Sequence, residues 1–528
     1  MKSKPLAVVI TLVGLALLAA CAPVPVSQAP APAEAPAAAE APAAAGPTGT
    51  LTIGVPVIID TLDPTMSNNV NIENVGLTVM EGLTYLNENN EVEPMLAESW
   101  EIVDDNTYIF HLREGVMFHN GEPFNADSVI FTEKWVKDTK RGAQYPWETV
   151  QSIEKIDDYT IKITTKAPDP LFLKRMGVAA GSIYPPKYVQ EVGDEGVTQK
   201  PVGTGPFVFK EWLRGEKVIF EANPNYWGGP DEAQVGTVVW KNIPEPDARI
   251  AALETGEIDI ALQVPAAQVG VLMDNSKLKV SRALSTRVFY MMFDNISSGK
   301  GTPIADKRVR QAMIHAVDRA AIIDAIFRGN GEVINSLVGN VQFGYDPSVA
   351  PLPYDPDKAK ALLAEAGHPD GFKIGMSCPS GGYANDVEVC QAIAGYLKDV
   401  GIEVDLQITD ANLYWDLWQN HQLAPMAFDG AGDRFRDPQM ALLAVKKTLP
   451  WMLWDDPEIH RMSEAAESTV DQEKRKEIFA ELQRYMQDEP PAIPLWELYN
   501  FSGVNTRVDG FIPRPNETVS VRGVSVRE

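Results

Sequence analysis

The fold of this chain is decided by three short segments that follow one another closely: L-A-E-S-W at 96–100, T-Y-I-F-H-L-R at 107–113 and F-H-N-G-E-P-F at 118–124. Residues 107–112 carry a period-2 pattern bounded by turn residues, which predicts a strand, and residues 99–103 and 160–164 share this pattern. Asn125 is a good N-cap for a helix that runs to about Asp138. Strands and a helix therefore succeed one another here.

The rest of the chain alternates in the same way. Residues 50–55, 372–376 and 402–408 read as short strands. One long amphipathic helix is expected from Asp306 to Gly329, and another from Asp355 to Gly367. Further helices are expected at 386–400 and about 471–487. Helices that alternate with apolar strands predict an α/β fold.

The first 48 residues have a different character. Two lysines precede an apolar run at 6–20, which is typical of a secretory signal and too short to span a membrane comfortably. Leu18-Ala19-Ala20-Cys21 resembles the lipobox of bacterial lipoproteins, in which cleavage leaves the cysteine as the lipidated first residue. The Ala- and Pro-rich tract that follows, up to residue 48, suits a tether. We therefore expect a signal peptide at 1–20 and lipidation at Cys21.

Composition narrows the class of protein. The net charge is −26, and removal of residues 1–20 with their two lysines would make it −28. Such acidity argues against binding to nucleic acid or to an anionic lipid surface. No second apolar run is long enough for a transmembrane helix, so we expect the lipid anchor to be the chain's membrane contact. The length beyond residue 48 predicts roughly three domains.

Three cysteines are present. If Cys21 carries lipid, Cys378 and Cys390 remain as an even pair in an oxidising compartment, which favours a disulfide. The strand at 372–376 ends just before Cys378, and Cys390 lies early in the helix that follows, so the two can meet. Two free buried thiols are the alternative.

From Thr50 to its end the chain resembles the family 5 solute-binding proteins of bacterial ABC importers, the peptide- and nickel-binding group. The opening three segments carry the most specific likeness. Further matching segments are L-D-P at 62–64, G-T-G-P-F at 203–207, N-P-N-Y-W at 223–227 and G-E-I-D at 256–259. The resemblance implies a type II periplasmic-binding-protein fold (cluster C), an α/β fold with two hinge-linked lobes and an extra domain inserted in the first. The expected ranges are 49–88, 203–293 and 489–528 for lobe I, 89–202 for domain II and 294–488 for lobe III.

The same resemblance implies a function. We expect a monomeric, non-enzymatic receptor without a cofactor, outside the cytoplasm on the periplasmic or cell-surface side. It would hold a peptide or peptide-like solute between lobes I and III and deliver it to the permease subunits of an ABC transporter. An oligosaccharide or a metal chelate is an alternative cargo. A secreted, lipid-anchored hydrolase is a weaker alternative, because the chain contains no nucleophile elbow and no metal-ligand spacing. The six histidines are scattered, so no tight histidine metal site is expected.

Two charged residues are candidates for contact with the ligand. Arg287 lies where the family chain crosses toward the third lobe, and its guanidinium could grip a carboxylate; a surface salt bridge is the alternative. Asp433 matches, with one residue inserted, the family position whose carboxylate pairs with the α-amino group of a peptide. Arg434 and Arg436 follow it, and internal pairing with one of them is the alternative.

Aromatic and polar residues supply the other candidates. Tyr383, Asn385 and Asp386 precede a helix and could present polar groups at its positive end, or simply cap it. Aromatic side chains interleave with polar ones around residue 415 and at 496–501, and by family position both segments approach the cleft. Trp415, Trp496 and Tyr499 are therefore candidates, with burial in the core as the alternative.

Overall fold

The computed structural model describes residues 47–527. The expected signal segment, Cys21 and nearly all of the expected tether lie outside these residues. No helix among the described residues is long and apolar enough to cross a membrane.

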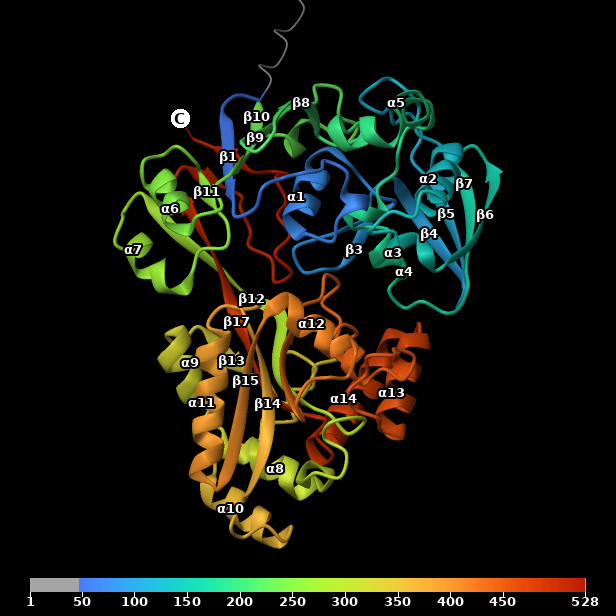
Figure 1. Cartoon of the computed structure of the whole chain (residues 1–528). Coiled ribbons are helices and arrows are strands. Elements are labelled where there is room, and N and C mark those ends of the chain that lie inside the picture. Colours follow the sequence, from blue (N-terminus) through green and yellow to red (C-terminus); the bar gives the residue numbers. More distant parts are fainter. Residues whose placement is uncertain (1–46, 528) are drawn as a thin grey trace, which may run out of the picture. The chain divides into compact units, whose positions relative to one another are not determined.

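Two long antiparallel strands lie at the centre of the fold and pair with each other: β12, Leu278–Phe293, and β17, Ala492–Asn505. They run together through the two halves of the largest sheet, whose order is β15-β14-β16-β12-β17-β11-β1-β10-β9-β8 (Figure 1). Their pairing is interrupted between Leu284 and Val288. Side chains before and after this interruption pack into different hydrophobic cores. The interruption therefore marks the place where the chain crosses between the two lobes.

Lobe I is built on one half of this sheet. Parallel pairing of β1 with β10 and β11 places its first strand at the centre, which explains why residues 51, 53 and 55 are fully buried. Its strands are β1 Thr50–Val55, β8 Phe207–Leu213, β9 Lys217–Ala222, β10 Thr237–Asn242 and β11 Ile260–Ala261; small pairs are β2 Thr84–Leu86 with β3 Val92–Pro94 and β18 Val508–Asp509 with β19 Ser525–Val526. Its helices are α1 Val70–Val79, α6 Pro246–Glu254 and α7 Val269–Met273.

Domain II contains the three segments that open the sequence analysis. The first two segments lie in strands β4 and β5 of an antiparallel sheet of order β4-β5-β7-β6, and the third forms a turn after β5. Strand β5 shows the strict alternation of burial typical of a strand with one buried face. Its elements are β4 Ala97–Asp104, β5 Thr107–Leu112, β6 Val150–Asp157, β7 Thr160–Thr165, α2 Ala126–Asp138, α3 Tyr145–Glu148, α4 Phe172–Arg175 and α5 Pro186–Gln199. Asn125 caps α2 by accepting a hydrogen bond from the Asp127 N–H, as expected.

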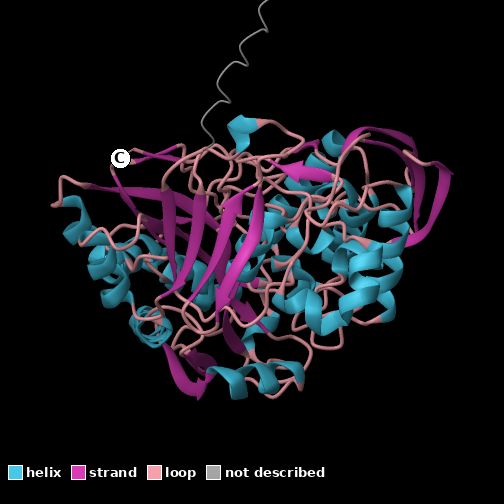
Figure 2. Cartoon of the chain, turned by 90° about the horizontal axis from the view of Figure 1, so that it is seen from above, coloured by secondary structure: helices cyan, strands magenta, loops and turns pink. Residues whose placement is uncertain are grey.

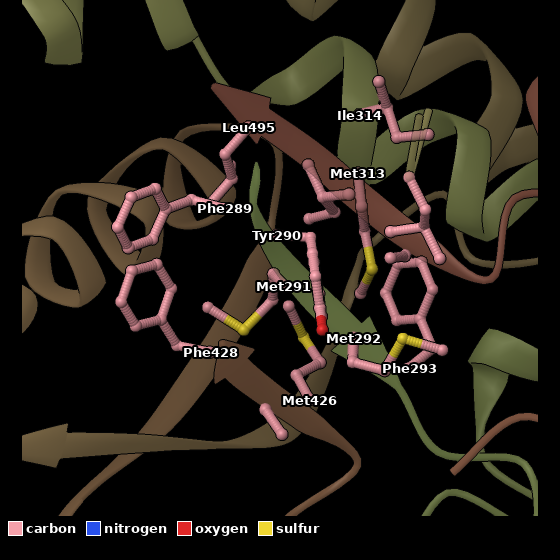
Figure 3. Packing of buried hydrophobic residues seen from close by; sticks show 14 of the residues in the cluster. Phe289, Tyr290, Met291, Met292, Phe293, Met313, Ile314, Met426, Phe428 and Leu495 are labelled. Atoms are coloured by element: carbon pink, nitrogen blue, oxygen red, sulfur yellow. The ribbon is translucent and has the colours of Figure 1, made fainter. Parts of the chain in front are cut away.

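Lobe III occupies the other half of the large sheet and is rich in helices (Figure 1). Seen from above, a group of strands lies in the middle of the molecule with helices on both sides (Figure 2). Its strands are β13 Gly331–Val333, β14 Phe372–Ser380, β15 Ile402–Asp410 and β16 Met426–Ala431. Its helices are α8 Lys307–Ala316, α9 Arg319–Phe327, α10 Pro356–Glu365, α11 Asp386–Asp399, α12 Ala411–Gln419, α13 Pro457–Ser468 and α14 Gln472–Asp488. Its core is centred on the end of β12, where Phe289 to Phe293 pack against Met313, Met426 and Leu495 (Figure 3).

Two sequence expectations in lobe III are corrected. The single helix expected from Asp306 to Gly329 is two helices, because Val317 adopts an extended backbone and the Asp318 side chain caps a new helix by accepting from the Ala321 N–H. The strand expected to end before Cys378 continues to Ser380, since it pairs with β15 along its whole length. Cys378 and Cys390 are joined by a disulfide between β14 and α11.

Candidate ligand-binding cleft

A cavity of about 780 Å³ lies where the two lobes and domain II meet. Lobe I contributes the Asn-rich segment 68–71, and domain II contributes Tyr145 and Arg175. The crossing of β12 contributes residues 285–287, and lobe III contributes residues 432–435. A volume of this size is typical of sites for small molecules. We call this cavity the cleft.

The lobe I wall is held by the beginning of α1. Asn69 caps this helix by accepting a hydrogen bond from the Asn71 N–H at 2.9 Å, which turns the chain before the helix toward the cleft. Glu73 follows in the first turn, where the helix dipole favours an acid. Its side chain is only 4% exposed.

Arg287 stands at the crossing between the lobes. Its Nη1 donates to the Gly430 carbonyl at 2.6 Å, and its guanidinium lies 5.8 Å from the centre of the Tyr383 ring. Among the described residues, no carboxylate lies within 4 Å of it. The half-buried guanidinium therefore brings a positive charge to the cleft that the protein does not neutralise directly.

The segment 433–437, which we call the strap, follows strand β16 and enters the cleft. Asp433 Oδ1 accepts hydrogen bonds from the N–H groups of Phe435 (2.6 Å) and Asp437 (2.9 Å). Burial raises the pKa of Asp433 to about 7, and the nearby charge of Asp437 adds to this. One oxygen of this carboxyl group is thus already engaged in hydrogen bonds to backbone N–H groups of its own loop.

The two arginines of the strap bind elsewhere than at Asp433. Arg434 Nε lies 3.1 Å from Glu73 Oε2, and its Nη1 donates to the Tyr145 hydroxyl at 3.1 Å. Arg436 donates to the carbonyls of Asn89 and Val341. The strap therefore ties lobe III to both lobe I and domain II.

A second cavity, of about 600 Å³, lies between domain II and lobe III beside the strap. Its two cations are already bonded to backbone: Lys174 Nζ donates to the Phe435 carbonyl at 2.8 Å, and Arg436 is held as described above. The cleft is lined by both lobes as well as by domain II, whereas the second cavity is lined by domain II and lobe III alone. The cleft is therefore the better candidate for a site that closes on a ligand.

The structure brings three of the predicted site residues together. Arg287 and Asp433 line the cleft. Tyr383 lies behind Arg287, and its hydroxyl donates to Asp429 Oδ1 at 2.7 Å. Asn385 is exposed with a φ of 59°, and Asp386 is buried and accepts from the N–H groups of Gly382 and Tyr383. These two residues organise the turn before α11 and do not line the cleft.

The remaining aromatic candidates also lie away from the cleft lining. Trp415 is half-buried, and its ring centre is 6.3 Å from that of Tyr383. Trp496 is fully buried in the core of lobe III, 5.7 Å from Phe327. The Tyr499 hydroxyl donates to Glu332 Oε1 at 2.6 Å. In this structure, none of the three lines the cavity.

Several lining residues escaped the sequence analysis. Tyr145, Arg175 and Glu517 reach the cleft from segments far apart in the chain, so no local pattern indicates them. The Asn-rich segment 68–71 could have been recognised from the sequence as a turn or helix cap, since asparagine favours both. Among the described residues, no group of three or more His, Cys, Asp or Glu side chains is arranged to hold a metal ion.

Comparison with known proteins agrees with this architecture. The family model described as "Bacterial extracellular solute-binding proteins, family 5 Middle" matches residues 91–450. Heme-binding protein A of Haemophilus influenzae is 29% identical over 83% of this chain and 84% of that protein. The dipeptide-binding protein of Escherichia coli is 27% identical over 80% of this chain and 84% of that protein.

A solved structure extends the likeness to the fold. HbpA2 from Haemophilus parasuis has a TM-score of 0.83 at 26% identity, with 91% of this chain and all of that chain covered. The match confirms the expected α/β fold with two lobes and an additional domain. The chain belongs to the bacterial extracellular solute-binding proteins, family 5.

Proposed function

We propose that this protein is the receptor of an ABC importer and that it captures a small peptide or peptide-like zwitterion in the cleft. The observation that carries this proposal is Arg287, a half-buried cation at the crossing between the lobes with no carboxylate beside it. A guanidinium in this position suits a carboxylate, which it can bind with two hydrogen bonds. The dipeptide-binding protein of E. coli, which is similar to this chain, supports the same class of ligand.

The ligand would join the two lobes. Arg287 would hold its carboxylate, and an acidic residue of the cleft would hold its amino group, Asp433 being the residue expected from the sequence. Contacts with both lobes would favour the closed arrangement over the open one, which is how a ligand shifts a hinge equilibrium. The proposal needs no catalytic group, so the protein acts by binding and release.

The remaining parts of the proposal concern location and partners. We propose that residues 1–20 direct export, that lipidated Cys21 anchors the protein outside the cytoplasm, and that the tract to residue 48 holds the folded part near a permease. We also propose that a monomer carries the ligand. The division into lobe I, domain II and lobe III is proposed at residues 88, 202, 293 and 488. With these boundaries, the end of β12 and the beginning of β17 belong to the lobe I ranges although their side chains pack in the core of lobe III.

Haem is disfavoured as the cargo, although one relative is named a heme-binding protein. The lining of the cleft includes no histidine or cysteine. Its half-buried tyrosine, Tyr145, accepts a hydrogen bond from Arg434, and desolvation of its hydroxyl together with the charge of Glu73 raises the pKa of this hydroxyl far above the usual value. This phenol would resist ionisation and would make a poor axial ligand.

The proposal is tested by titration calorimetry of the purified protein against dipeptides and tripeptides, a set of oligosaccharides and a nickel chelate. We expect saturable, one-to-one binding of peptides and a loss of about 10-fold or more in affinity for Arg287→Gln. The variant Arg282→Gln is a suitable control, because Arg282 is exposed outside the cleft lining. Binding of a sugar or chelate in place of peptides would overturn the proposed ligand class.

A further inference from the structure

A loop near the end of lobe I presents a carboxylate to the cleft. Glu517 lines the cavity, and its backbone is fixed on both sides: its N–H donates to the Arg514 carbonyl at 3.0 Å, and its own carbonyl accepts from Asn74 Nδ2 at 3.2 Å. Its φ is 62°, in the left-handed region that a glutamate rarely adopts. Strained backbone of this kind often marks a functional position.

The residue that faces Glu517 has an unusual backbone as well. Gln263 also lines the cleft, has a φ of 52°, and donates from its side-chain amide to Glu517 Oε2. Asn500 Nδ2 donates to Oε1 at 3.1 Å. Two amides thus orient the carboxylate without neutralising its charge, and no Lys or Arg of the described residues lies within 4 Å of it.

The same loop lies next to the other cleft elements. The Pro515 carbonyl accepts from the Thr286 N–H at 3.0 Å, and Thr286 precedes Arg287. Asn516 Nδ2 donates to the Arg434 carbonyl at 2.8 Å. Glu517 and Arg287 therefore line the same cavity from adjacent segments, so one small ligand can contact both side chains.

The other acids of the cleft are less available. Glu467 accepts two hydrogen bonds from Lys446 Nζ, at 2.8 and 2.9 Å. Asp433 is 7% exposed and already accepts two backbone N–H groups. Glu517 also accepts two amide hydrogen bonds, but it is more exposed than Asp433 and, unlike Glu467, has no lysine or arginine partner among the described residues.

We propose that Glu517, on lobe I, is the specificity-determining contact for the ammonium group of the ligand, in place of Asp433. This assignment rests on the proposed function and deepens it, because it predicts a preference for ligands with a free amine. A zwitterion would then be held between Glu517 on lobe I and Arg287 at the crossing between the lobes. Its two charges would be matched by Glu517 and Arg287, neither of which has an ion-pair partner among residues 47–527.

The test compares Ala-Leu with N-acetyl-Ala-Leu by titration calorimetry on the wild-type protein and on Glu517→Gln. We expect the wild type to prefer the free amine by about 10-fold or more, and the variant to lose this preference while it binds the acetylated form as before. Glu467→Gln is the matched control, since it makes the same change to a neutralised acid of the same cavity. It should keep the preference.

A second variant at position 517 distinguishes the loss of the carboxylate from a folding defect of Glu517→Gln. Glu517→Gly removes the carboxylate and suits the left-handed backbone, so it should unfold at the same denaturant concentration as the wild type or higher. It too should lose the preference for the free amine. If either Glu517 variant retains the preference, or if Asp433→Asn alone abolishes it, the assignment is wrong. If the wild type binds neither these compounds nor any other peptide, the proposed function itself is overturned, and the assignment with it.

Discussion

Two arginine–carboxylate pairs lie at the two ends of the strap. One connects residues within lobe III, and the other connects lobe III to lobe I. At one end, Arg475 and Asp437 are both fully buried and joined by two hydrogen bonds, at 2.6 and 2.9 Å, within lobe III. At the other end, Arg434 and Glu73 are 21% and 4% exposed and join lobe III to lobe I by a single contact of 3.1 Å. A pair within one body can stabilise the fold, whereas a pair between two bodies acts on how they close.

The surroundings of the two pairs reinforce this difference. Arg475 also donates to the Ala466 carbonyl and lies 5.0 Å from the ring centres of both Phe343 and Phe479. The Glu73 carboxylate makes no hydrogen bond that satisfies ordinary geometry, although the strap arginine lies beside it. Burial raises the pKa of Glu73, and Arg434 opposes this rise. Glu73 therefore depends on the strap for its charge partner.

The largest effect is expected from breaking the inner pair. Asp437→Asn should lower the free energy of unfolding by about 3–5 kcal/mol, because it leaves the buried Arg475 guanidinium without a counter-charge. Chemical denaturation monitored by circular dichroism measures this change. A variant that unfolds at the wild-type denaturant concentration would show that the pair does not stabilise lobe III.

A pH effect of similar order is expected beside the same pair. Burial raises the pKa of Asp433 to about 7 in the folded protein, whereas the pKa of an aspartate in the unfolded chain is about 4. Between about pH 4 and pH 7, the folded state therefore binds the proton more tightly than the unfolded chain does. The contribution of Asp433 to stability is therefore greatest below about pH 4, falls as the pH rises, and levels off above about pH 7. Its full size is on the order of 4 kcal/mol.

Denaturation curves at several pH values test this sign. Asp433→Asn should remove the fall between about pH 4 and pH 7, and Asp437→Asn should move it to lower pH, since it removes a negative charge that raises the pKa of Asp433. If the difference in stability between wild type and Asp433→Asn is independent of pH, the carboxyl does not titrate in this range.

The disulfide provides a comparison away from the strap. It links β14 to α11 with a sequence separation of 12, and a loop of this length predicts a stabilisation of about 3 kcal/mol. The double variant Cys378→Ser, Cys390→Ser should lose about this amount and leave peptide affinity within about twofold of the wild type. A strong loss of affinity would mean that lobe III transmits local changes to the cleft.

Local patterns in the sequence predicted much of this fold. The alternation at 107–112 and the caps Asn125 and Asp355 each specify an element through neighbouring residues, and each element is present. The break at Val317 was missed because its apolar spacing continues across both helices, and only the cap at Asp318 separates them. A prediction from helical apolar spacing therefore misses a boundary at which a capping residue starts a new helix without interrupting that spacing.

The cleft was less predictable, for a physical reason. Arg287 and Asp433 were found through family resemblance, whereas Glu73 and Glu517 acquire their roles only from partners hundreds of positions away. The sequence analysis left open whether Asp433 pairs with Arg434 or Arg436, and both arginines are bound elsewhere. Charge pairing across lobes depends on the tertiary arrangement, and the spacing of residues along the sequence does not indicate it.

The smallest effect on stability, and the most specific one, is expected at the outer pair. Glu73→Gln should change the free energy of unfolding by no more than about 1 kcal/mol, because the loss of the ion pair is offset by relief from burying a charge. It should nevertheless weaken peptide binding several-fold, because a contact between lobes contributes to the closing equilibrium and its loss favours the open form.

Calorimetry and small-angle scattering on the same variant separate these two quantities. Arg434→Gln should weaken binding at least as much, because Arg434 also donates to the Tyr145 hydroxyl and the Asn68 carbonyl. The double variant should be no weaker than Arg434→Gln alone, since that variant already lacks the contact with Glu73. Asp437→Asn, assayed under conditions where it is folded, should bind with nearly wild-type affinity. If Glu73→Gln instead loses stability as Asp437→Asn does and binds normally, the outer pair belongs to the rigid fold and the contrast between the two ends of the strap fails.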